Sequence, residues 1–257
     1  MKKTKKRKSS VLLLDGDLIA YRTSAAKEHP INWGDGLWTL HSDEKECQLA
    51  AKQYIEHLQT ITGIDEVVIA HSAPVNFRKE LNPTYKANRA ETRKPMALKP
   101  LQAWLKEEYS VLGFPRLEAD DVMGIAGSEG GSMFIIISDD KDMMTIPSWH
   151  FIPDTRTFME VNRAQANFNF YCQALTGDAT DNYKGVPNVG RKTAEKILMG
   201  VDPLDEVTMW ERVKHSYLKA GLTEDDAIMN ARMARILRHG EYDMKANKEI
   251  LWTPPKA

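Results

Sequence analysis

Two kinds of residue that could do chemistry stand side by side in residues 175–194, which read LTGDATDNYKGVPNVGRKTA. Asp178 and Asp181 are three residues apart, a spacing that on a helical turn puts both carboxylates on one face, close enough to hold one cation. Gly, Pro and Asn in residues 185–190 favour a tight hairpin, and the helix predicted over residues 192–198 begins with backbone N–H groups that suit a phosphate. A cation site beside a phosphate site is typical of an enzyme that cuts phosphodiesters. A surface turn with a capped helix explains either half alone.

Further polar residues directly follow short apolar runs, and these runs are predicted as buried strands. The runs and the residues that follow them are 11–14 with Asp15, 67–70 with His71 and Ser72, and 133–137 with Asp139, Asp140 and Asp142. Helical patterns separate the runs, so the predicted fold class is α/β with a mainly parallel sheet and flanking helices. Ligands of such sheets bind beyond the carboxyl ends of the strands, where these side chains should meet.

The chemistry that fits this edge is phosphodiester hydrolysis with two Mg²⁺ ions about 4 Å apart, which activate water, neutralise the phosphate and stabilise the leaving oxygen. Mg²⁺ prefers hard oxygen ligands and keeps several waters. The candidate ligands are Asp15, Glu118, Asp120, Asp121, Asp140, Asp142, Asp178 and Asp181. Residues 118–121 begin a predicted helix, and the helix dipole favours carboxylates at this position even without a metal ion.

Residues 77–99, FRKELNPTYKANRAETRKPMALK, have a different character because seven are Lys or Arg and only two are acidic. Phe77 and Tyr85 alternate with the cations, a combination typical of a groove that attracts nucleic acid and stacks its bases. A solvated loop and helix is the alternative. Because this insert follows the second predicted strand, it could cover the site as a lid.

Composition excludes several other classes. The chain has 257 residues, enough for a full core, and a net charge of −1. Cys47 and Cys172 lack metal-type spacing and are expected as reduced thiols in a cytoplasmic protein. The sequence holds no apolar run of membrane-spanning length, so no membrane partner is expected. The predicted organisation is a basic disordered arm, an α/β domain with the insert, and a helical module, at residues 1–10, 11–174 and 175–257.

Five motifs occur in this order along the chain: DGD from Asp15, FRKE…YKANR from Phe77, EADD from Glu118, SDDKD from Ser138 and GDATDNYKGVPNVGRKTA from Gly177. Together they resemble the 5′-nuclease family, which includes phage 5′–3′ exonucleases, flap endonucleases and the nuclease domain of bacterial DNA polymerase I. The sequence is most similar to the stand-alone exonucleases of T7-like phages. The resemblance covers residues 11–198, and the helices beyond only loosely.

The resemblance implies a PIN-like nuclease core with a helical arch and a helix-hairpin-helix in the C-terminal module. It also implies metal-dependent cleavage of duplex DNA from the 5′ side, as an exonuclease and flap endonuclease that also removes RNA primers, in phage replication or host DNA degradation. Its implied cofactors are two Mg²⁺ ions, replaceable by Mn²⁺, and K⁺ at the hairpin. One ion would be held mostly by Asp15, Glu118, Asp120 and Asp140, and the other by Asp142, Asp178 and Asp181, with Asp121 close by.

For DNA, the resemblance places Lys86 and Arg89 on the scissile phosphate as catalytic residues, with Tyr85 stacking on a base. The expected DNA contacts are Arg78, Lys79, Tyr85, Arg93, Lys94, Gly185, Val186, Gly190, Arg191, Lys192 and Thr193. The expected partners are duplex DNA with 5′ ends, nicks or flaps, RNA–DNA hybrid and replication proteins, and the chain is expected to be a monomer.

The sequence departs from the family pattern at two places. His71 and Ser72 stand where many members have an acidic residue, so we expect water to complete the metal shell there. Asn188 replaces a usual glycine, which left-handed geometry permits but which weakens the predicted K⁺ site. A PIN-like RNase and a non-catalytic DNA-binding helix-hairpin-helix protein are the alternatives; the hairpin and basic insert disfavour the first, and the many carboxylates disfavour the second.

Overall fold

The structure is a computed structural model that describes residues 10–256, so the predicted arm lies outside the described residues except for Ser10. A six-stranded sheet forms the centre of the α/β part. Its strands, in spatial order, are β5 (Ser110–Leu112), β4 (Val67–Ala70), β1 (Val11–Asp15), β6 (Phe134–Ile137), β7 (Ser148–Ile152) and β8 (Thr157–Val161). All neighbouring strands are parallel except β7 and β8. The predicted α/β class and its three central strands are confirmed.

The central strands are apolar throughout because both faces of the sheet are covered. Leu12 and Leu14 face one hydrophobic cluster, and Leu13 between them faces another. The first face is covered by α1 (Gly16–Ala26), α2 (Glu44–Thr62) and α4 (Leu98–Glu108). The second face is covered by α5 (Ala119–Gly127) and by the segment around Ile236.

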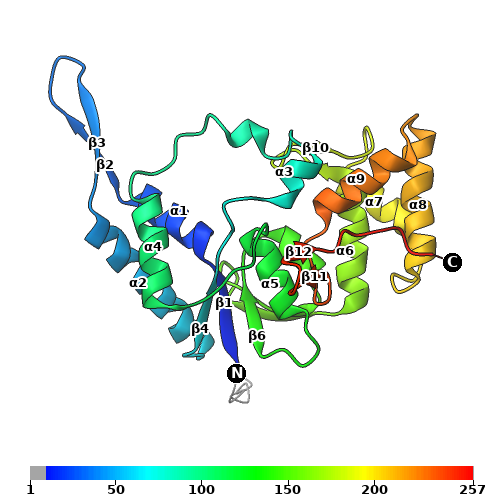
Figure 1. The fold of residues 1–257 in the computed structure, drawn as a ribbon, viewed down its shortest axis with the longest axis horizontal. Helices are drawn as coiled ribbons and strands as arrows, with labels where there is room; N and C mark the ends of the chain where they lie inside the picture. Colours follow the sequence, from blue (N-terminus) through cyan, green and yellow to red (C-terminus); the bar gives the residue numbers. More distant parts are fainter. Residues whose placement is uncertain (1–9, 257) are drawn as a thin grey trace.

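The C-terminal part is a helical layer beside this sheet (Figure 1). Its helices are α6 (Arg163–Thr176), α7 (Arg191–Leu198), α8 (Glu206–Lys219) and α9 (Glu224–Ala234), which share a cluster around Trp210 and Tyr217. The helix predicted over residues 192–198 is therefore present as α7. Two short ribbons complete this part, β9 (Gly177–Asp178) with β10 (Tyr183–Lys184) and β11 (Tyr242–Asp243) with β12 (Lys248–Glu249).

Between α3 (Phe77–Leu81) and α4 the basic insert crosses the molecule as a mostly irregular segment (Figure 1). Its one further helical element is the 3₁₀ turn η1 (Ala87–Arg89). The insert thus holds less helix than the predicted helical arch. The physical reason lies in Pro83 and Pro95, because a residue before proline is driven away from helical geometry.

The antiparallel ribbon of β2 (Glu28–Asn32) and β3 (Trp38–Ser42) projects from the body and was not predicted (Figure 1). The 3₁₀ helix η2 (Lys141–Thr145) follows β6. Among the described residues, no helix is both long and apolar enough to cross a membrane.

Candidate active site

The acidic residues at the carboxyl edge of the sheet are held by the helices that they begin. Asp15 ends β1 and caps α1, where its Oδ1 accepts hydrogen bonds from the backbone of Asp17 at 2.8 Å and of Leu18 at 3.0 Å. Asp140 follows β6 and caps η2, where it accepts from the backbone of Asp142 at 2.9 Å. Capping fixes each carboxylate at the edge where the parallel strands end.

Asp15, Glu118, Asp120 and Asp140 form one electrostatic group. Burial raises the pKa of Asp120 well above its usual range, and the charges of Asp15, Glu118 and Asp140 raise it further. Burial also raises the pKa of Asp15 to about 6. These carboxylates therefore crowd one another in a poorly solvated place, an arrangement that a bound cation would relieve.

A second group lies around Asp142. Burial raises its pKa to about 6, and Asp140, Asp178 and Asp181 add to the rise. Asp178 ends β9 and Asp181 lies in the loop that leads to β10, so neither is on the expected helical turn. There the Asp178 carboxylate accepts from the backbone of Thr180 at 2.6 Å and of Asp181 at 3.2 Å. This side-chain turn holds the Asp181 backbone against the Asp178 carboxylate, and the charges of both residues act on Asp142.

Side chains of the basic insert reach these carboxylates. The Lys86 ammonium donates to Glu118 Oε1 at 2.6 Å and lies 3.5 Å from Asp181 Oδ2. Arg89 donates to Asp181 Oδ1 at 2.6 Å. The Tyr85 hydroxyl donates to Glu118 at 2.9 Å and lies 3.0 Å from Asp181. The insert is thus fastened to both acidic groups.

The hairpin before α7 is shaped by two residues with special backbone requirements. A Cβ at Gly185 would lie 2.2 Å from the Leu175 carbonyl oxygen, so only glycine fits. Asn188 has a φ of 62°, a left-handed conformation that asparagine tolerates. Gly190 then caps α7, whose first turn carries the exposed residues Arg191, Lys192 and Thr193. Backbone N–H groups and exposed cations at a helix start suit an anion.

The donor set at the edge fits a hard divalent cation because it consists of carboxylate oxygens. Within residues 10–256, no three acidic, His or Cys side chains converge on one point closely enough to make a ready ligand cage. Mg²⁺ does not require such a cage, since it is usually held by one or two carboxylates and its own waters. The raised pKa values of Asp15, Asp120 and Asp142 also fit a cation site, because a bound cation would favour the charged form of each carboxylate.

Two family models together match almost the whole chain. The model for the 5′-3′ exonuclease N-terminal resolvase-like domain matches residues 10–169, and that for the 5′-3′ exonuclease C-terminal SAM fold matches residues 169–256. This chain belongs to the 5′-3′ exonuclease family. The predicted 5′-nuclease resemblance is therefore confirmed, and the chain is an exonuclease of this family.

Individual relatives agree with this assignment. The chain is 32% identical to the exodeoxyribonuclease of Enterobacteria phage T3 and 31% identical to the exonuclease of Escherichia phage T7, in each case over 95% of this chain and 93% of the relative. The crystal structure of the T5 D15 protein, co-crystallised with metal ions, has a TM-score of 0.61 and 18% identity, covering 88% of this chain and 89% of that one. At this identity the T5 structure supports the fold alone.

Three predicted site residues of this exonuclease are structural instead. Arg78 is 2% exposed, and its guanidinium donates to both oxygens of Asp121 at 2.7 Å, so it is not available to DNA. Asp121 is 0% exposed and also accepts from the backbone of Leu237, so it is not a metal ligand. Tyr85 is 3% exposed, so its ring cannot stack on a base.

The other predicted contacts of the exonuclease are differently placed. Lys79 and Lys94 are exposed, and Arg93 is exposed while it pairs with Glu28. Val186 is buried, which leaves only its backbone for DNA. Arg191 pairs with Glu195 at 2.7 Å.

Asp17 was noted in the DGD motif but not predicted as a site residue. Its carboxylate accepts from the backbone N–H of Ser72 at 2.9 Å and from Gln102 at 2.6 Å. The Ser72 hydroxyl in turn accepts from the backbone of Ala119 at 2.9 Å. Ser72 therefore joins the end of β4 to the first turn of α1 and to the start of α5, whereas the sequence predicted only a water molecule at this place.

The packing of His71 accounts for Gly16 in the DGD motif. The imidazole is buried and lies 3.9 Å from the Asp17 carboxylate. A Cβ at Gly16 would lie 2.6 Å from the ring. The turn from β1 into α1 therefore requires glycine beside this histidine, a contact between distant segments that the motif alone does not reveal.

Proposed function

We propose that this exonuclease hydrolyses phosphodiesters of duplex DNA from the 5′ side with two divalent cations, Mg²⁺ or in its place Mn²⁺. One observation carries the proposal. Two clusters of carboxylates lie at one edge of the sheet, and cations of the insert bond to a carboxylate of each cluster, Lys86 to Glu118 and Arg89 to Asp181. The first ion would lie at the group of Asp15, Glu118, Asp120 and Asp140, held by one or two of these carboxylates and by its own waters. The other group would hold the second ion through Asp142, Asp178 and Asp181.

Bound ions would supply an activated water and would neutralise charge on the attacking and leaving oxygens. The carboxylates would hold these ions in place, because helix caps and turns fix the position of each carboxylate. Asp15 and Asp120 are only partly exposed and are poorly solvated, so electrostatic interactions there are stronger than in solution.

Lys86 and Arg89 contact the phosphate that is cut. Burial lowers the pKa of Lys86, but Glu118 and Asp181 raise it more, so the side chain stays cationic. Its ammonium already lies among carboxylates that the proposal assigns to both ions. The Lys86 ammonium can therefore move a short distance from Glu118 to a phosphate oxygen. There it stabilises the negative charge that develops in the transition state.

The hairpin at residues 185–190 and the start of α7 hold the DNA backbone away from the cut. Backbone N–H groups and Lys192 suit phosphates of any sequence. K⁺ at the hairpin belongs to the same proposal. The proposal also includes nicked, flapped and RNA-primed duplexes as substrates. In it, the exonuclease acts as a monomer beside replication proteins.

The experiment is cleavage of 5′-labelled nicked, flapped and RNA-primed duplexes with Mg²⁺, with Mn²⁺ and with EDTA. We expect products cut near the 5′ end with either metal and none with EDTA. The relative rates rank the three substrates. Full activity in EDTA would contradict the proposal, and release of 3′-terminal nucleotides would contradict its direction.

A further inference from the structure

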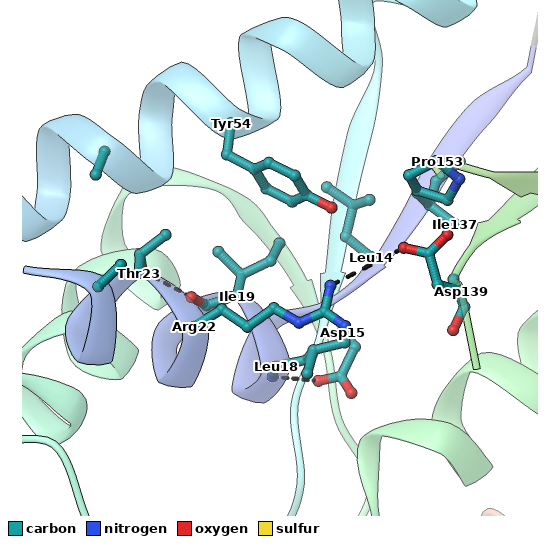
Figure 2. Close-up of a pocket in the computed structure, with 13 residues that line it drawn as sticks. Leu14, Asp15, Leu18, Ile19, Arg22, Thr23, Tyr54, Ile137, Asp139 and Pro153 are labelled. Atoms are coloured by element: carbon teal, nitrogen blue, oxygen red, sulfur yellow. Dashed lines mark hydrogen bonds and ion pairs between the residues drawn. The ribbon is translucent and has the colours of Figure 1, made fainter. Parts of the chain in front are cut away.

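A cavity of about 270 Å³ lies beside the acidic edge, between α1, α2 and the ends of β1 and β6 (Figure 2). Its walls are mainly apolar, with Leu14, Leu18, Ile19 and Ile137 among them. The volume is near the lower end of small-molecule sites, which span about 300–1,000 Å³. The cavity thus has room for one small flat group.

The cavity lies where the fold favours a ligand. β1 and β6 are parallel neighbours, yet the chain continues from β1 to β4 on one side and from β6 to β7 on the other. Ligands of open α/β sheets bind at such a switch point, beyond the carboxyl ends of the strands. Asp15 belongs both to this cavity and to the acidic edge, so the two sites share a wall.

Three polar side chains meet in the cavity. Figure 2 shows Arg22 extending from α1 toward Asp139 and Tyr54 entering the same space from α2. The Arg22 guanidinium lies 4.0 Å from the Asp139 carboxylate. Asp139 is held by a 2.9 Å hydrogen bond from the backbone of Asp154. A planar donor, a fixed acceptor and an aromatic ring are the groups that bind a nucleobase through its edge and face.

A phosphate suits the cavity poorly, since its carboxylates Asp15 and Asp139 repel anions and its walls are apolar. We propose that the cavity receives the base of the 5′-terminal nucleotide while the adjoining phosphate lies at the acidic edge. This inference rests on the proposed hydrolysis from the 5′ side. Stacking serves any base, so the cavity sets where the cut falls and not which sequence is cut.

The test compares two nicked duplexes, one with a normal 5′-terminal nucleotide and one with an abasic residue there, in single-turnover assays with Mg²⁺. Ala50→Phe fills the cavity, because Ala50 lines it on α2. Ala25→Phe is the matched control, since Ala25 is exposed on α1 and does not line the cavity.

We expect the abasic end to slow wild type and Ala25→Phe about tenfold, within the range expected for one base–aromatic contact. Ala50→Phe should cut both duplexes at one, slower rate. A 2-aminopurine at the 5′ end, bound in Ca²⁺, should lose fluorescence with wild type and not with Ala50→Phe. Equal wild-type rates on both duplexes, with unchanged 2-aminopurine fluorescence, would overturn the cavity assignment. Absence of cleavage of either duplex would instead overturn the proposed function.

Discussion

Three cations of the basic insert and one cation at the hairpin have opposite surroundings. Arg78, Lys86 and Arg89 each pair with a carboxylate of the same chain. At the hairpin, Lys192 is exposed at the start of α7. These three insert cations therefore balance charge that the protein has gathered at its own acidic edge, whereas Lys192 presents its charge to solvent.

A count of basic residues therefore does not locate a DNA-binding surface. A cation bonded to a buried carboxylate gains strength from the low dielectric, and moving it costs more than moving a solvated one. Loss of an insert cation that pairs with the acidic edge should therefore change the chemistry, and loss of an exposed cation should change affinity.

The largest effect is expected from Asp142→Asn, which removes a carboxylate of the acidic edge. Single-turnover cleavage of a nicked duplex in Mg²⁺ should fall by orders of magnitude, because the second proposed ion loses a charged ligand. The melting temperature in EDTA should stay equal or rise, since repulsion from Asp140 and Asp178 is relieved. Asp154→Asn, at an exposed aspartate, is the control and should cleave at the wild-type rate. Wild-type cleavage by Asp142→Asn would remove this residue from the site.

Next, Lys86→Ala should lower kcat about 10²-fold while binding of the duplex changes little, because the ammonium acts mainly on charge that develops in the transition state. Lys94→Ala is the matched control in the same insert. Lys94 is exposed, so its loss should weaken binding and reduce the salt dependence with little effect on kcat. Identical kinetic profiles for the two variants would show that the insert is only a general electrostatic groove.

A pH effect on stability should follow from the raised pKa values of Asp15 and Asp142, each about 6. A carboxyl with a raised pKa holds its proton more tightly in the folded state. Its contribution to stability is therefore full at low pH and is lost as the pH rises from about 4 to about 6. Melting in EDTA should show wild type losing stability relative to Asp142→Asn across this range. A constant difference between the two proteins would contradict the shift.

The smallest effect is expected from Ser72→Ala. The variant loses the hydroxyl that accepts from the Ala119 backbone at 2.9 Å, so stability should fall by about 1 kcal/mol. The rate should fall only severalfold, because Ser72 positions the start of α5 and would not contact the phosphate. Ser72→Thr should restore both, as measured by denaturant unfolding and single-turnover cleavage. Wild-type stability in Ser72→Ala would show that the hydrogen bond contributes nothing measurable.

The sequence predicts the acidic edge well because its geometry follows from local rules. Apolar runs give parallel strands, and the residues after them, Asp15 and Asp140, meet at one edge. Burial of Arg78 could not be predicted, because its partners Asp121, Met233 and Arg235 come from distant segments. The same is true of Tyr85 and the cavity, which depend on how helices pack and not on any motif.

The most direct test of the separation uses Asp181→Ala and Lys192→Ala on one 5′-labelled nicked duplex, with binding measured in Ca²⁺ and single-turnover cleavage in Mg²⁺. Asp181→Ala should abolish cleavage while affinity holds or tightens, because Lys86 and Arg89 lose an internal partner and become available to phosphate. Lys192→Ala should weaken binding and reduce the log–log salt slope by about one unit. Its rate at saturating DNA should stay within about tenfold of wild type, because this contact is similar in the ground and transition states. Normal cleavage by Asp181→Ala, or loss of cleavage at saturating DNA in Lys192→Ala, would contradict the account.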